Sequence, residues 1–185
     1  EALLEAVEAH RIEPLNSYSS SVLAAVHEYL QETEKARALS RCAIELSVDN
    51  GDALQRLVRL AQTDRDRKEE FAFIERELTR QVVGGDGLLA FVQLARPFLD
   101  PEALLNRLRD GHRARPDLWH TWAALVSQCG HLKRLDEALQ IAGQASDRFP
   151  HLPKVWLDLA IVHQWRNEPD AEIAAAEAAF EINPA

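Results

Sequence analysis

Apolar residues recur along most of this chain at intervals of three and four, which is the spacing of one face of an α-helix. Two clear stripes are Leu54, Leu57, Val58 and Ala61, and Leu118, Trp122, Leu125, Val126 and Cys129. Runs of β-branched residues are scarce, whereas alanine and leucine are abundant. Since these features favour helix over strand, we expect an all-α protein.

The pattern divides into one leading helix, expected at residues 1–11, and five helix pairs. We expect the pairs at 19–31 and 33–46, 51–63 and 67–81, 86–95 and 101–113, 117–130 and 134–148, and 153–166 and 169–182. Asp100 and Pro101 are a helix-start signal, because aspartate caps an N-terminus and proline fits the first turn. Pro97 should end the preceding helix near Ala95.

The helix pairs repeat at a constant interval along the chain. The sequence numbers of Trp122 and Trp156 differ by 34. The same difference relates Leu125 to Leu159, Ala145 to Ala179, Pro116 to Pro150, and Pro150 to Pro184. Extended backwards, the proline column continues at Val82, Val48 and Pro14. Because one hairpin cannot bury its own apolar face, such repeats must stack. We therefore expect a single repeat domain over 1–185, with repeats at about 17–50, 51–84, 85–118, 119–152 and 153–185.

The two clearest repeats resemble the tetratricopeptide repeat (TPR) family. The residues that carry the resemblance are Trp122, Leu125, Asp136, Glu137, Ala138, Ala145 and Pro150, and then Trp156, Leu159, Ala160, Ala179 and Pro184. The chain departs from the family pattern at Val126, where glycine or alanine is usual, and at His27, Cys129 and His163, where tyrosine is common. The resemblance implies an α-solenoid that winds as a right-handed superhelix, with the first helix of each pair on its concave face.

The formal net charge of −9 argues against a nucleic-acid partner or an anionic membrane, because both require a basic surface. No apolar stretch reaches the roughly 18 residues of a membrane span. The chain begins without methionine, inside a helical pattern, so we interpret it as a fragment of a longer protein. A cytoplasmic location is favoured, although a fragment does not show its targeting.

Residues that suggest catalysis or metal binding have simpler structural explanations. No two of the seven histidines have the i,i+3 or i,i+4 spacing of helical metal ligands, and His27 and His163 share one repeat column. The stretch 83–87 is glycine-rich but lacks the lysine of a phosphate loop, and Ser19 to Ser21 lack a nucleophile elbow. Acidic pairs at 69–70 and at 75 and 77 are interpreted as a solvated helix face. We expect no cofactor, no metal and no enzymatic activity.

Candidate binding residues are the concave-face positions that the resemblance implies. They are Tyr18, Gln55, Arg56, Arg59, Gln93, Arg96, His120, Ser127, His131, Lys154 and Trp165. The three arginines suit a peptide that carries carboxylates. The alternative is that they pair with Asp52, Asp86 or other local acids. Trp165, with Leu157 and Ile161, is either an apolar anchor for a partner or the seam for a following repeat.

These features predict a scaffold that binds a protein or peptide segment, with an acidic segment as one expectation. The lysine and asparagine set of the chaperone-tail clamp in the TPR family is not found, which argues against a C-terminal EEVD ligand. The alternative function is a structural spacer or self-assembly segment of a larger protein, which includes the regulation of a fused catalytic domain. In that case the open ends of the repeat stack would associate.

Overall fold

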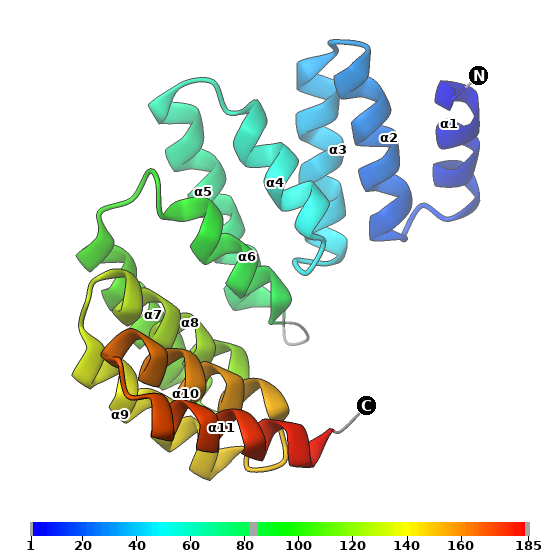
Figure 1. The fold of residues 1–185 in the computed structure, drawn as a ribbon. Coiled ribbons are helices and arrows are strands. Elements are labelled where there is room, and N and C mark those ends of the chain that lie inside the picture. The colour runs from blue at the N-terminus through cyan, green and yellow to red at the C-terminus, as the bar shows by residue number, and fades with distance from the viewer. Residues whose placement is uncertain (1, 82–84, 184–185) are drawn as a thin grey trace. The chain divides into compact units, whose positions relative to one another are not determined.

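The computed structural model describes residues 2–81 and 85–183, and this part of the chain is helical without a strand. Figure 1 shows the helices joined by short connections. They are α1 (Ala2–Ile12), α2 (Ser17–Tyr29), α3 (Thr33–Leu46), α4 (Gly51–Leu60), α5 (Asp64–Arg80), α6 (Asp86–Ala95), α7 (Pro101–Ala114), α8 (Trp119–His131), α9 (Leu135–Arg148), α10 (Pro153–Arg166) and α11 (Pro169–Ile182). The predicted all-α repeat fold is confirmed.

The helices form two compact units, and each is described by itself. Unit 1 spans Glu1–Ala95 and contains α1 to α6, whereas unit 2 spans Arg96–Ala185 and contains α7 to α11. Within unit 1, α2 and α3 lie side by side as an antiparallel hairpin, and in unit 2 α10 and α11 do the same (Figure 1). The joining of both units into one superhelical domain stays a prediction.

Three hairpins close through the same turn. Gln31, Lys133 and Asn167 have positive φ angles of 61°, 59° and 58°, and they occupy one column of the repeat register. In each turn the following residue donates its backbone N–H to a carbonyl five residues back, as Glu32 does to His27 at 2.9 Å. This geometry satisfies the last carbonyls of the first helix. The turn therefore repeats with the sequence, although none of its left-handed residues is glycine.

The α4–α5 hairpin departs from this pattern. Helix α4 ends at Leu60, before the expected residue 63, and α5 begins at Asp64, before the expected residue 67. The reason is a capping box: the Thr63 hydroxyl accepts from the Asp66 backbone N–H, and the Asp66 carboxylate accepts from that of Thr63. Helix α6 ends at Ala95 and Asp100 caps α7, both as predicted.

The tryptophan and proline columns are coupled by a recurring hydrogen bond. The Trp122 indole donates to the Pro116 carbonyl at 3.0 Å, and Trp156 donates to Pro150 at 3.0 Å. Each bond ties the start of a first helix to the turn before it. Val82 and Pro184, which continue the predicted column, lie outside the described residues.

The predicted solvated acidic face is wrong for Glu70 and Glu77. Glu70 is fully buried, and its carboxylate accepts from Arg37 Nη2 at 2.6 Å and from Arg41 Nε at 2.8 Å. Burial opposes ionisation of Glu77, but hydrogen bonds from Arg80 and Gln81 hold the pKa of this carboxyl below its ordinary value. Glu70 is neutralised by two arginines of the neighbouring helix α3, whereas the partners of Glu77 are Arg80 of its own helix and Gln81 directly after it.

The glycine-rich stretch has a packing role in the part that the structure describes. The backbone N–H groups of Gly85 and Gly87 donate to Asp49 Oδ1 at 3.0 and 2.7 Å. A Cβ atom on Gly87 would lie 2.3 Å from the Val48 carbonyl oxygen, so only glycine fits there without a shift. Val83 and Gly84 lie outside the described residues.

Candidate functional site

An apolar stripe runs along the exposed side of α2. Tyr18, Val22, Ala25 and Tyr29 are separated by four, three and four residues, so they share one helix face about 16 Å long. Tyr18 is 68% exposed and Tyr29 is 88% exposed. Exposed apolar residues that gather on one face can mark a binding site. The stripe is therefore the first component of a candidate site.

Local sequence explains why α2 presents this face. Asn16 caps the helix, because its side-chain oxygen accepts from the Tyr18 backbone N–H at 2.8 Å. The Ser19 hydroxyl donates to the carbonyls of Glu13 and Asn16 at 2.8 and 2.9 Å. With the helix start held in this way, the buried Leu23 and Ala24 point into unit 1. The tyrosines consequently point away from the core.

The stripe forms one wall of an open groove of about 360 Å³ in unit 1. Residues from α1, α2 and α4 line it. They are Ala2, Tyr18, Ser21, Val22, Ala25, Val26, Tyr29, Asp52 and Arg56. The lining combines aromatic and aliphatic area with a few polar groups that can orient a ligand, as is typical of binding sites.

Arg56 and Arg59 form an ion-pair cluster with Glu28 at the edge of the groove. Glu28 Oε2 accepts from Arg56 Nε at 3.1 Å and from Arg59 Nη2 at 2.7 Å. Arg56 also donates to the buried Ser21 hydroxyl at 3.1 Å. The Arg56 side chain is only 11% exposed, whereas that of Arg59 is 59% exposed. Arg56 is therefore fixed in place, while Arg59 keeps surface that a ligand can reach.

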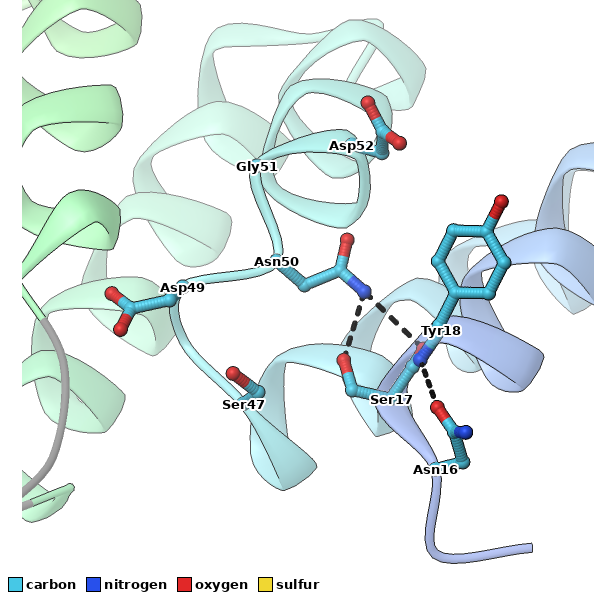
Figure 2. A pocket seen from close by; sticks show the side chains of 8 residues that line it. All are labelled: Asn16, Ser17, Tyr18, Ser47, Asp49, Asn50, Gly51 and Asp52. Atoms are coloured by element: carbon cyan, nitrogen blue, oxygen red, sulfur yellow. Dashed lines mark hydrogen bonds between the residues drawn. The ribbon is translucent and has the colours of Figure 1, made fainter. Parts of the chain in front are cut away.

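A second depression of about 460 Å³ adjoins the first at Tyr18 (Figure 2). It lies where the ends of α2, α3 and α4 meet, and Figure 2 shows Asn50 bridging two of them. The Asn50 amide donates to the Ser17 hydroxyl at 2.8 Å and to the Ser17 carbonyl at 3.2 Å, while its oxygen caps α4 through Ala53. Because Asn50 and Asn16 serve as helix caps, this depression is mainly a structural junction.

The remaining predicted residue of α4, Gln55, is exposed, and so is Gln93 on α6. In unit 2 the predicted residues are mostly engaged in packing. Arg96 donates to Gln128 at 3.1 Å and to the Ser127 hydroxyl at 2.7 Å, and burial lowers the pKa of its guanidinium. His120 stacks on Trp119 with ring centroids 3.7 Å apart. His131 is exposed at the end of α8.

Lys154 and Trp165 on α10 also have local partners. Lys154 forms an ion pair with Asp158 one turn later. Trp165 is 40% exposed, and its ring lies against the backbone of Gly130, because a Cβ atom there would be 2.1 Å from the ring. Trp165 therefore serves in part to pack α10 on α8.

Metal-ligating and thiol side chains are the remaining candidates for chemistry. Among residues 2–81 and 85–183, no group of three or more His, Cys, Asp or Glu side chains is placed to hold a metal ion. Cys129 is buried, and burial raises the pKa of its thiol to about 11, which disfavours the reactive thiolate. In the same part of the chain, no helix is both long and apolar enough to cross a membrane.

Sequence reasoning identified Tyr18 and Arg56 in this groove but missed Tyr29 and Glu28. A signal for Tyr29 was present, because it occupies the same register column as His131 and Trp165, which were identified. Glu28 gave no comparable signal: its partners lie 28 and 31 residues later, on another helix. The predicted alternative of local ion pairing applies to Arg56 and Arg59, with Glu28 as the acid.

No protein-family model matches the sequence, and no curated protein matches it. Solved structures do share its fold. YrrB, described as a TPR protein with an unusual peptide-binding site, is 16% identical and superposes with a TM-score of 0.51, covering 100% of this chain and 93% of its own. MamA is 9% identical with a TM-score of 0.53, covering 88% of this chain and 95% of its own. The chain therefore has a TPR-like repeat fold.

Proposed function

We propose that this protein is an interaction scaffold that binds a peptide segment in the groove between α2 and α4 of unit 1. The observation that carries the proposal is the exposed stripe from Tyr18 to Tyr29 beside the Arg56–Glu28–Arg59 cluster. The ligand in this proposal is an extended or helical segment with apolar side chains and a carboxylate.

The tyrosines act as the apolar anchors. Aromatic residues dominate the energetics of interfaces because they bury much area with few rotatable bonds. Tyr18 and Tyr29 stand at the two ends of the stripe, with the smaller Val22 and Ala25 between them. This arrangement offers a ligand two aromatic contacts and a shallow apolar floor.

The cluster supplies the selectivity for an acidic group. Two arginines share the single carboxylate of Glu28, so the cluster carries an excess positive charge inside an acidic protein. Arg59, whose side chain is 59% exposed, can form a charge-assisted hydrogen bond with a ligand carboxylate without leaving Glu28. Asp52 on the groove lining disfavours a second carboxylate near Tyr18.

The similarity to YrrB supports the peptide ligand at the level of the fold. YrrB is described as having an unusual peptide-binding site, and its structure superposes on 100% of this chain. At 16% identity, no residue of that site is transferred to this chain.

Selection from a displayed peptide library on the whole protein tests the proposal. Selected peptides should combine apolar residues with at least one acid. Tyr29→Ala should weaken the binding of a selected peptide roughly tenfold, since the loss of an aromatic anchor is among the largest interface effects. Arg59→Ala should weaken it about threefold, because this pair is partly exposed.

Two matched controls belong to the same calorimetric titration. Phe180→Ala removes an exposed aromatic side chain from unit 2, and Arg65→Ala removes an exposed cation from α5. Both control variants should bind the selected peptide with an affinity within about twofold of that of the parent protein. Failure to select any peptide, or equal losses in the control and groove variants, would overturn the proposal.

A further inference from the structure

The outward face of α11 carries a second apolar stripe, which one glutamate interrupts. Ile173, Ala176, Glu177 and Phe180 follow one another at helical spacing, so they share one face. All four are exposed, with Ile173 at 56% and Phe180 at 63%. The stripe lies on unit 2, whereas the proposed peptide groove lies on unit 1.

The repeat register identifies what kind of face this is. The positions one repeat earlier, on α9, are Leu139, Ala142, Gly143 and Ser146; those two repeats earlier, on α7, are Leu105, Leu108, Arg109 and His112. All eight are buried or half-buried. In each case the helix that follows packs on this helix, α8 on α7 and α10 on α9. The stripe on α11 is thus built as a helix-covered contact face.

One position of this face carries an ion pair in other repeats. Arg41 pairs with Glu69 at 3.2 Å, and Arg109 pairs with Glu137. In both cases the acid lies on the next second helix, at the same offset from its arginine. Glu177 occupies the same register column as the arginines with the opposite charge. The sign of Glu177 therefore requires a cation as its ion-pair partner.

The whole of α11 is negatively charged, as Glu177 is. Helix α11 contains Asp170, Glu172, Glu177 and Glu181 and no lysine or arginine. Glu172 accepts from Gln164 within its own hairpin at 3.1 Å, whereas the other three acids are exposed. They flank and interrupt the apolar stripe, so any segment that covers it meets negative charge along the full contact.

We propose that the α11 stripe binds a partner helix that carries arginine or lysine beside an apolar stripe. The apolar residues cover Ile173 and Phe180, and a cation pairs with Glu177. A second copy of this chain is a poor occupant, because its own α11 would oppose these acids with like charges and its net charge is −9. The α1 helix of a second copy is no better, since it places Glu5 and Glu8 next to Leu4 and Val7, and its Arg11 already pairs with Glu8 at 2.7 Å.

Two synthetic helical peptides test the proposal by fluorescence anisotropy with the whole protein. Each is long enough to form a helix by itself, which in water requires more than about 15 residues. Both carry leucine at i, i+3 and i+7, while one has arginine and the other has glutamate at the flanking positions. The arginine peptide should bind and the glutamate peptide should not. Glu177→Lys should weaken the arginine peptide roughly tenfold, because it replaces attraction by repulsion.

Controls separate this surface from the peptide groove and from a nonspecific charge effect. Asp147→Lys makes the same charge change at an exposed position of α9 and should alter the affinity by less than twofold. Tyr29→Ala should leave the arginine peptide unaffected, whereas Phe180→Asp should abolish its binding. Equal effects of Glu177→Lys and Asp147→Lys, binding that survives Phe180→Asp, or dimerisation of the protein that Phe180→Asp removes would each overturn the proposal.

Discussion

Glu70 joins α5 to α3 through a buried carboxylate. Its helix is strongly charged, and charged runs normally face solvent. The carboxylate is nevertheless buried, because Arg37 and Arg41 on α3 reach it from 33 and 29 residues away. Such a partner is invisible to local periodicity, so sequence reasoning could place Glu70 on a helix but could not identify its buried pairing.

Removal of this carboxylate should be costly. Glu70→Ala leaves two partly buried arginines without their shared acid, and we expect a loss of about 3 kcal/mol in unfolding free energy. Glu69→Ala is the matched control, because Glu69 also contacts Arg41 but its side chain is 62% exposed. Its expected loss is below about 1 kcal/mol. Urea denaturation compares the two, and equal losses would contradict the assigned role of Glu70.

Asp158 is the opposite case, a carboxylate that burial destabilises. Burial raises the pKa of Asp158, and the Lys154 ammonium offsets this only in part. Its Oδ2 atom is buried without a hydrogen-bond partner. A carboxyl whose pKa is higher in the folded state loses stability as pH rises through the interval between its unfolded and folded values.

Asp158→Asn should therefore be more stable than the parent at pH 7. The difference should shrink as pH falls towards 3.8, the ordinary value of the group, because the parent carboxyl is then protonated in the folded state. Thermal unfolding between pH 4 and pH 8 measures this. Asp147→Asn, at an exposed position of α9, should show no comparable pH-dependent gain; a constant difference for Asp158→Asn would refute the explanation.

At the scale of single elements, caps and turns decide where helices begin and end. The period predicted each described helix, and Asp100, Pro101 and Pro97 predicted their boundaries correctly. The hairpin α4–α5 was shifted because Thr63 and Asp66 form a capping box that the apolar pattern does not reveal. Capping side chains thus determine where the helices begin and end, whereas the apolar periodicity predicts that the helices form.

The start of α6 depends on a close approach of two backbones. Gly87→Ala forces a Cβ atom against the Val48 carbonyl, and we expect a loss of about 1–3 kcal/mol in unfolding free energy. Gly51→Ala at the start of α4 is the control, because a Cβ atom there meets no atom within 4 Å. It should be neutral or stabilising by up to about 1 kcal/mol. A Gly87→Ala protein as stable as the control would show that the approach is easily relaxed.

At the scale of the whole molecule, the 34-residue repeat register relates the fold to the candidate binding surfaces. The same columns place the three left-handed turns, the tryptophan–proline bonds and the covered faces of the second helices. The fold could therefore be predicted from the sequence. The groove could be predicted only in part, since Tyr18 and Arg56 follow from the register but Glu28 depends on packing between helices.

Peptide binding along α2 and α4 of unit 1 can be located residue by residue. Backbone amide chemical shifts of the whole protein, recorded during titration with a library-selected peptide, test it. We expect the largest changes at Tyr18, Val22, Ala25, Tyr29 and Arg59. Saturable binding whose changes lie entirely in other helices, with these amides unmoved, would contradict it.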